Sequence, residues 1–177
     1  MKKKIFIFIS IFCLANYAQS DCGQSKSFIG NAFKTDLVAL VTIDSSYHHG
    51  FLLNIIEVWR GKVNSDLILV WSNSECETER DQIEGSKGDT LLVSIYHQKQ
   101  DISCNTKYID FVEKAGENVF HTDDCETNIL KMKHGFFIGQ ISKKSGTFIE
   151  DGKSNFYPYE EEKQSLNFLK QIIAVLK

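Results

Sequence analysis

Hydrophobic residues gather in several short segments of the chain, and this pattern predicts β-strands. Four segments rich in β-branched and aliphatic residues are separated by polar or glycine-containing stretches. They cover residues 36–43, 51–59, 66–71 and 90–96. Asp44, Ser45 and Ser46, between the first two, are typical of a turn. Several short strands at this spacing favour a small barrel or sandwich over an alternating strand–helix fold.

Two hairpins are predicted beyond these strands. One joins residues 108–112 to 119–122 across a glycine-containing turn at 114–117, and the other joins residues 136–141 to 147–150 across 143–146. The fold class predicted is therefore mainly β, a small OB-type five-stranded barrel with an added C-terminal hairpin and an amphipathic helix. The barrel is expected to cover residues 21–128, and residues 129–177 form a C-terminal extension.

The amphipathic helix is predicted at the C-terminal end, over residues 159–176. Pro158 precedes the acidic residues Glu160, Glu161 and Glu162, which suit the first turn of a helix. Apolar residues then recur at helical spacing from Leu166 to Leu176. We expect this apolar stripe to pack on the barrel, because the polar face of the helix is not notably basic. Binding to a membrane surface or a partner is the alternative.

The first 20 residues have the features of a signal peptide. A positive segment at residues 2–4 is followed by a short apolar run at 5–14 and by small residues up to Ser20. Ala18 and Ser20 fit cleavage before Asp21, and cleavage after Ala18 is the alternative. The apolar run is short for a membrane span, so an anchor is the less favoured interpretation. The mature chain is expected to be secreted or periplasmic.

Charge disfavours nucleic acid as a partner. The chain has 20 basic and 23 acidic residues, a formal net charge of −3. Removal of a signal peptide holding Lys2, Lys3 and Lys4 would leave 17 basic residues and a net charge of −6. This charge would repel a phosphate backbone. At 42% hydrophobic and 24% charged residues, the composition is that of a folded globular chain.

Four cysteines remain after the predicted cleavage, and an exported protein normally pairs them. They are Cys22, Cys76, Cys104 and Cys125, an even number that predicts two disulfides with three possible connectivities. A zinc site is the competing interpretation. It would require closer pairs, and the nearest spacing here is 21 residues.

Several short motifs follow one another along the chain in a distinctive order. They are Cys22, Ala32-Phe33, Asp36-Leu37-Val38, Val58-Trp59-Arg60-Gly61, Cys76, Gly88 and Thr122-Asp123-Asp124-Cys125. This order resembles a netrin-like domain, and more narrowly the N-terminal domain of tissue inhibitors of metalloproteinases and their bacterial relatives. The resemblance covers about 60% of the chain, roughly residues 22–128. It implies an OB-type barrel of five strands, in agreement with the strand pattern.

The resemblance also implies how the cysteines pair. The family opens with Cys-x-Cys, whereas this chain has Cys22-Gly23-Gln24 and lacks the second cysteine. Cys22 then corresponds to the family's first cysteine and would pair with Cys76, which leaves Cys104 to pair with Cys125. A regular hairpin centred on residues 115–116 would also bring Cys104 and Cys125 opposite each other.

In the inhibitors, the amine and carbonyl of an amino-terminal cysteine chelate the zinc of the protease. The resemblance assigns an inhibitory or binding set of Cys22, Gly23, Glu75 and Cys76 to this chain. Chelation requires Cys22 to be the first residue, whereas the favoured cleavage leaves Asp21 in front of it. Gly23 also has no side chain to enter a specificity pocket. Inhibition of a metalloproteinase is therefore the alternative function.

Other candidate chemistry is sparse. His48 and His49 lie in a loop, and His97, His121 and His134 have no metal-site spacing. Asp123 and Asp124 are more typical of an acidic turn than of a cation site. Trp59 and Trp71 would form a ligand-stacking face or, more simply, be buried at strand ends. No G-x-S-x-G, P-loop or G-x-G-x-x-G motif is present. The sequence thus favours a secreted, non-enzymatic binding module for a protein partner, with no cofactor.

Overall fold

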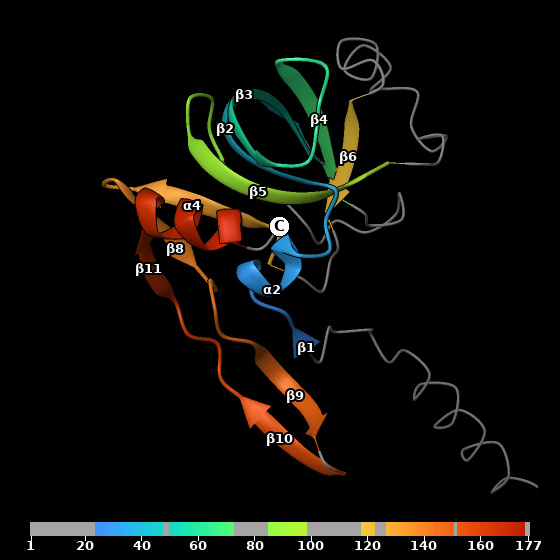
Figure 1. Ribbon diagram of the computed structural model, residues 1–177, viewed down its shortest axis with the longest axis vertical. Helices are drawn as coiled ribbons and strands as arrows, with labels where there is room; N and C mark the ends of the chain where they lie inside the picture. Colours follow the sequence, from blue (N-terminus) through green and yellow to red (C-terminus); the bar gives the residue numbers. More distant parts are fainter. Residues whose placement is uncertain are drawn as a thin grey trace, which may run out of the picture.

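The part of the chain that the structure describes is mainly β, with two short helices (Figure 1). The computed structural model describes residues 24–47, 50–72, 85–98, 118–122, 127–150 and 152–175. Its elements, in chain order, are β1 (Gln24–Ser25), α2 (Phe28–Ala32), β2 (Leu37–Tyr47), β3 (Gly50–Arg60), β4 (Leu67–Ser72), β5 (Thr90–His97), β6 (Val119–Thr122), β7 (Ile129–Lys133), β8 (Phe136–Gly139), β9 (Ser145–Glu150), β10 (Lys153–Tyr157), β11 (Glu162–Ser165) and α4 (Leu166–Val175).

Five strands, β2 to β6, close into a barrel. Their order is β5-β2-β3-β4-β6, and β6 pairs again with β5 to complete the ring. The pairing of β4 with β6 is parallel and the other four are antiparallel. This closed five-stranded arrangement confirms the predicted OB-type barrel. All five strands overlap segments that the hydrophobic pattern predicts.

Apolar side chains fill the inside of the barrel. Alternate residues of β2 point inward, beginning at Leu37, and meet inward residues of the other four strands. Bulky aliphatic and aromatic residues dominate this buried cluster, which contains Leu37, Ala39, Val41, Ile43, Phe51, Leu53, Ile68, Val70, Leu91, Val93, Ile95 and Phe120. The barrel interior is therefore a packed core, and a ligand must bind elsewhere.

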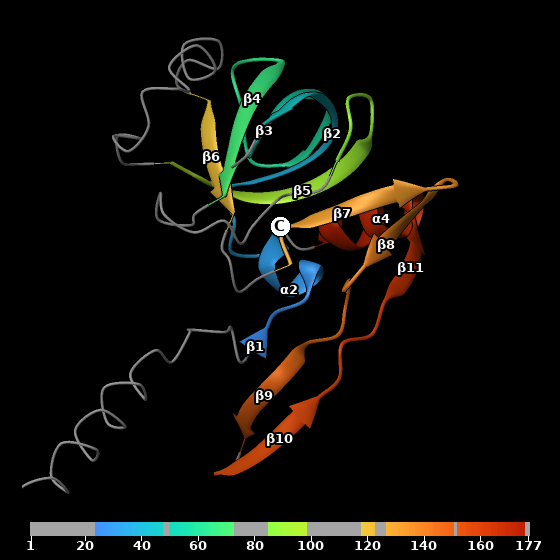
Figure 2. The same ribbon diagram turned by 180° about the vertical axis from the view of Figure 1, so that it is seen from behind.

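A second apolar layer covers one outer face of the barrel. Val38 and Leu40 of β2 and Leu92 of β5 point outward, opposite to the barrel core. α2, β7, β8 and α4 lie along this side of the barrel (Figure 2). Their side chains complete the layer, which also contains Phe28, Ala32, Trp59, Leu130, Phe137, Ile141, Leu169 and Ile173. Because β2 is buried on both faces here, residues 37–41 are continuously apolar.

The predicted C-terminal helix starts later than its acidic residues indicated. α4 begins at Leu166, and residues 162–165 form β11, which pairs with β8. Glu162 therefore belongs to a strand and not to the first turn of a helix. Its carboxylate accepts hydrogen bonds from the backbone N–H groups of residues 141–143. α4 packs on the outer layer through Leu169 and Ile173, and Lys170 forms a 2.5 Å ion pair with Glu57 of β3.

The pairing predicted between residues 136–141 and 147–150 is wrong. β8 pairs with β7 and β11, and β9 pairs with β10 and β1. The β7–β8 turn uses His134 and Gly135, both with positive φ, 51° and 79°, as the type I′ form of a two-residue hairpin turn requires. At the β9–β10 turn, Gly152 has a φ of 75° and follows Asp151, an Asp-Gly pair that favours hairpins.

The turn predicted at residues 44–46 is also wrong, because β2 continues through this segment to Tyr47. The register against β3 shifts between Ile43 and Ser45, as in a β-bulge. Asp44 absorbs this shift, and Tyr47 then pairs with Gly50. The polar residues thus mark an irregular part of a strand rather than its end.

The motif residues around Arg60 meet at one corner of the barrel. The guanidinium of Arg60 donates a hydrogen bond to the carbonyl of Ala32 at the end of α2. Gly61 has a φ of 88°, and a Cβ atom there would lie 2.1 Å from the carbonyl oxygen of Asp36. The Asp36 carboxylate accepts a 2.9 Å hydrogen bond from the backbone N–H of His97. These residues therefore attach α2 and β5 to the end of β3.

Candidate functional site

The site residues that the family resemblance implies lie outside the described residues. This holds for Cys22, Gly23, Glu75, Cys76, Cys104 and Cys125, and equally for His48, His49, Asp123 and Asp124. The two disulfides and the inhibitory set accordingly stay predictions.

The remaining candidates occupy structural positions. Trp59 and Trp71 are buried, as the simpler of the two interpretations expected. His121 stacks on Tyr96 with a ring-centroid distance of 5.6 Å, and His97 contacts the edge of Phe120 at 5.3 Å. Within the described ranges, no three His, Cys, Asp or Glu residues are grouped to hold a metal ion. None of the described helices has the length and apolar character needed to cross a membrane.

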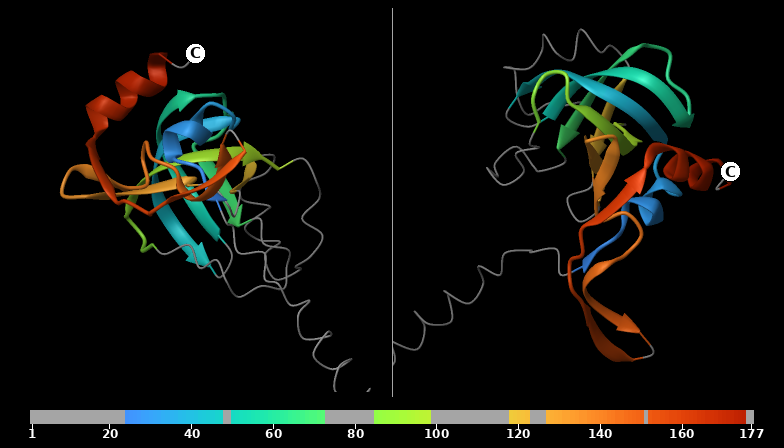
Figure 3. Two further views of the ribbon diagram at one scale, coloured as in Figure 1. Left: turned by 90° about the horizontal axis from the view of Figure 1, so that it is seen from below. Right: turned by 90° about the vertical axis from the view of Figure 1, so that its left-hand side faces the viewer.

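The β9–β10 hairpin projects away from the barrel (Figures 1 and 3). It forms a small three-stranded sheet with β1. Cross-strand pairs such as Ile149–Ser154 and Phe148–Asn155 fix its register, so that neighbouring pairs face opposite sides of the sheet. The hairpin therefore has two different faces.

The outer face of the hairpin carries two large apolar side chains that are open to solvent, and their cross-strand partners are Ser154 and Thr147. Ile149 is 77% exposed and Phe156 is 74% exposed. Each of them is next to Phe148 or Tyr157 along its strand, so the two pairs of side chains point to opposite faces of the hairpin. Large apolar side chains exposed to this degree on a projecting hairpin are typical of a binding surface.

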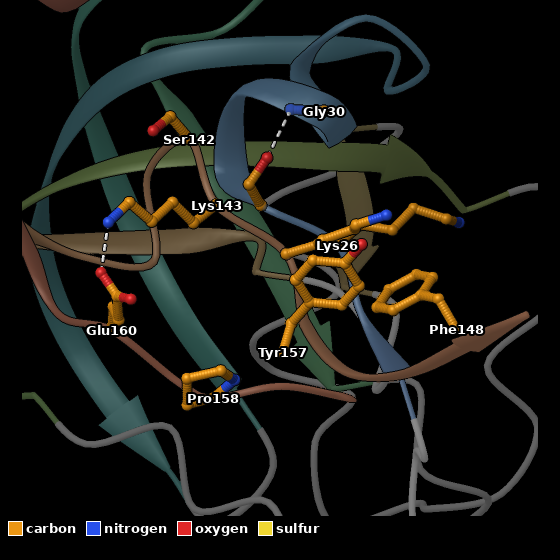
Figure 4. Close-up of a pocket in the computed structure, with 10 residues that line it drawn as sticks. Lys26, Gly30, Ser142, Lys143, Phe148, Tyr157, Pro158 and Glu160 are labelled. Carbon is orange, nitrogen blue, oxygen red and sulfur yellow. Dashed lines mark hydrogen bonds and ion pairs between the residues drawn. The ribbon is translucent and has the colours of Figure 1, made fainter. Parts of the chain in front are cut away.

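The other face of the hairpin borders a pocket of about 550 Å³ (Figure 4). Phe148 and Tyr157 line one side, and their rings lie edge to face with centroids 5.8 Å apart. The start of α2, residues 142–144, Pro158 and Glu160 line the rest. The volume falls in the range of small-molecule sites, and the walls come from four parts of the chain.

Lys144, which belongs to the pocket-lining residues 142–144, contacts three side chains of the hairpin. Its ammonium forms an ion pair with Glu150 and lies 4.3 Å and 4.6 Å from the ring centroids of Tyr157 and Phe148. The Tyr157 hydroxyl donates a 2.7 Å hydrogen bond to Glu150. The hydrogen bond from Lys144, with a second from Tyr157, lowers the pKa of Glu150, and the Glu150 carboxylate raises the pKa of Lys144 and of Tyr157.

Glu162 fixes the loop that forms the opposite wall. Its Oε2 accepts hydrogen bonds from the backbone N–H groups of Ile141 (2.9 Å), Ser142 (2.6 Å) and Lys143 (3.1 Å), and Oε1 accepts the Ser142 hydroxyl at 2.6 Å. Burial raises the pKa of Glu162, but these hydrogen bonds outweigh it and hold the pKa below its ordinary value. Three successive N–H groups around one carboxylate form an anion-binding nest.

Lys143 and Glu160 form an ion pair at the edge of the pocket, opposite the two rings (Figure 4). Their side chains are 55% and 51% exposed. The hydrogen bond from Lys143 to Glu160 raises the pKa of Lys143. Exposed pairs of this kind are weak because water competes for both charges, so this pair opens easily.

The chain directly after Gly23 lies beside this hairpin. Gln24 and Ser25 pair with Gly146 and Ser145 of β9. α2 follows, with Ser27 as its N-cap, and the N–H groups of Phe28 and Ile29 donate hydrogen bonds to the carbonyls of Gln140 and Ile141. The amino end of the described chain is thus fixed against residues 140–146.

The sequence pattern assigns several residues of this site to other roles. Lys143 and Lys144 fall in a predicted turn, and Pro158, Glu160 and Glu162 fall at a predicted helix start, because nothing in the sequence links Glu162 to residues 141–143. The sequence signal for the hairpin is the Asp-Gly pair at 151–152.

No protein-family model matches this sequence, and no curated protein matches it. The geometry of the hairpin and its pocket is therefore the basis for a functional proposal.

Proposed function

We propose that the chain is an exported, non-enzymatic binding module that contacts a protein partner through the outer face of the β9–β10 hairpin. The resemblance of residues 22–128 to a netrin-like domain supports the proposal for the barrel. The observation that carries it is the exposure of Ile149 and Phe156, at 77% and 74%, on one face of a projecting hairpin.

Two features make this face suited to a protein rather than to a small molecule. Ile149 and Phe156 do not line the pocket, whereas Phe148 and Tyr157 line it from the other face of the hairpin. The hairpin is also held in place, since β1 pairs with β9 and Lys144 pairs with Glu150. A fixed pair of large apolar side chains loses little entropy on binding and serves as an anchor in protein interfaces.

The test places a photo-crosslinking amino acid at position 156 or 149 of the protein as its own host produces it. We expect one discrete crosslinked partner from both positions. Ile56 of β3 is the matched control, because it is also a strand residue with a side chain 53% exposed, but it lies on the barrel. Once the partner is identified, Ile149→Ser with Phe156→Ser is expected to weaken binding at least tenfold, and Ile56→Ser is not. Crosslinking from position 56 alone would contradict the proposal.

A second candidate function is inhibition of a zinc metalloproteinase through the amine and carbonyl of Cys22. The pairing of Gln24 and Ser25 with β9 favours this inhibition. It holds the residues that come directly after Cys22 and Gly23 in the sequence beside the exposed hairpin. A protease that accepted the amino end in its active site would then have Ile149 and Phe156 available for a second contact.

This candidate makes a sharp prediction about the first residue of the mature chain. A chain that begins at Cys22 is expected to inhibit at least one enzyme in a panel of zinc metalloproteinases. The same chain with Asp21 retained is expected to lose inhibition by a hundredfold or more, because the cysteine nitrogen is then in a peptide bond and is no longer a ligand. Equal inhibition constants for the two chains, or no inhibition by the first, would reject chelation and leave the hairpin proposal standing.

A further inference from the structure

We propose that the pocket behind the hairpin binds a monocarboxylate with an apolar body, and that Lys143 receives the carboxylate. The inference goes beyond the protein-binding proposal, because the ligand occupies the face of the hairpin that carries Phe148 and Tyr157. The outer face, with Ile149 and Phe156, takes no part in it.

The walls of the pocket define the apolar part of the ligand. Phe148, Tyr157 and Pro158 present rings to a space of about 550 Å³. The two aromatic rings are already in edge-to-face contact, so they form a continuous surface before a ligand arrives. An apolar chain or ring placed there would replace water against these rings.

The charged groups around the pocket define the polar part. Three lysines and one glutamate line it: Lys26, Lys143, Lys144 and Glu160. The ammonium of Lys144 is held by Glu150 and two aromatic rings, so it maintains the wall. Lys143 differs in degree, because its side chain and that of its partner Glu160 are 55% and 51% exposed, against 36% and 41% for Lys144 and Glu150. A ligand carboxylate can exchange with Glu160 on Lys143, because both present a carboxylate to the same ammonium group.

The loop that carries Lys143 is fixed in advance. Glu162 binds the N–H groups of Ile141, Ser142 and Lys143, and Gln140 donates a 2.8 Å hydrogen bond to the carbonyl of Lys143. The backbone under Lys143 is therefore held from both its N–H and its carbonyl. A site that is ordered before binding pays little entropy when the ligand enters.

This chemistry has two possible sources, a free fatty acid or the terminal carboxylate of a peptide that ends in an apolar residue. Calorimetry on the purified protein with decanoate, and with a six-residue peptide ending in Leu-Phe, separates them. The neutral probes are 1-decanol and the same peptide with an amidated end. We expect at least one acid to bind, with its neutral counterpart at least tenfold weaker. The acid that binds identifies the source.

Variants locate the site. Lys143→Gln is expected to weaken binding of the acid about tenfold, whereas Lys170→Gln is the matched control and leaves it unchanged. Lys170 is also an exposed lysine in an ion pair, but its partner is Glu57 of β3, and neither residue lines the pocket. In ¹H–¹⁵N spectra, the amide signals of Gly30 and Ser142 are expected to shift with the acid.

Three results would overturn the proposal: no binding of either acid, equal affinity for the acid and neutral forms, or unchanged affinity in Lys143→Gln. Lys143 is exposed, so this variant is expected to keep the fold, and its far-ultraviolet circular dichroism checks that it does. Crosslinking from Phe156 is independent of these results, so failure here leaves the protein-binding proposal untouched.

Discussion

Replacing Phe137 with alanine is expected to lower the free energy of unfolding by about 3–5 kcal/mol, the usual cost of removing a buried phenylalanine. Phe137 is fully buried in the outer apolar layer, opposite Met132 of β7 and Gln164 of β11. The cavity left by the ring would lie where β8 and α4 pack on the barrel. Urea denaturation monitored by tryptophan fluorescence measures the change, since Trp59 belongs to the same layer.

The neighbouring phenylalanine provides the control. Phe136 is 39% exposed, and the Lys163 ammonium lies 4.1 Å from its ring centroid. Phe136→Ala therefore removes one partly solvated contact, and we expect a loss of about 1 kcal/mol or less. Similar losses from the two variants would show that the outer layer does not support the fold as its burial indicates.

Replacing Glu162 with alanine is expected to lower the free energy of unfolding by about 2 kcal/mol, because four hydrogen bonds to a charged carboxylate disappear. Three of their donors are backbone N–H groups that would then rely on water. Glu161→Ala is the control, since Glu161 is adjacent, exposed and of the same charge. We expect that variant to change the unfolding free energy by less than about 0.5 kcal/mol. Equal losses from both variants would contradict the role of the carboxylate.

The contribution of Glu162 also predicts a pH dependence. Its pKa is lower in the folded chain than in the unfolded chain, where a glutamate has a value of about 4.3. The unfolded state therefore binds the proton more readily, and stability from Glu162 is fully present above about pH 4.3. It is lost as the pH falls through the lower folded-state value. Urea titrations between pH 7 and pH 3 should show a smaller loss of stability for Glu162→Ala than for the unmodified chain.

The barrel strands were predictable because each carries enough aliphatic residues to be recognised alone. Residues 36–43 and 90–96 are nearly continuous apolar runs, and the structure explains why, since both faces of β2 and β5 are buried. A strand covered on both sides needs no polar positions. Four of the five barrel strands followed from this signal, and β6 was predicted as one arm of a hairpin, whereas it pairs with β4 and β5.

The C-terminal pairings were not predictable from periodicity, because these strands are short and partly polar. β10 contains Lys153, Ser154 and Asn155, and β11 contains Glu162, Lys163 and Gln164, so neither has a strong apolar pattern. β11 pairs with β8 through the backbone, which a side-chain pattern does not report. The acidic run 160–162 also fitted a helix start better than a strand, until its contact with residues 141–143 was known.

The candidate site depended on contacts between distant parts of the chain. Lys144 meets Glu150 and Tyr157, and Glu162 meets a loop about 20 residues earlier. Sequence analysis favoured the cysteines instead, because cysteine spacing carries a family signal whereas a lysine over two rings does not. Aromatic residues make up 12% of the chain, but composition does not show which of them lie together in the fold.

The pairing of β1 with β9 has a consequence for the order of assembly. These strands are separated by about 120 residues of sequence, whereas β2, β3 and β5 pair with closer neighbours. Contacts between segments that are distant in sequence form slowly, because the entropy cost of closing a long loop comes before the contacts can stabilise the chain. During synthesis, Gln24 and Ser25 must wait until residues 145–146 have emerged. The amino end therefore reaches its final place only after the barrel strands are available, and a chain interrupted before β9 would contain the barrel strands without the β9–β10 hairpin.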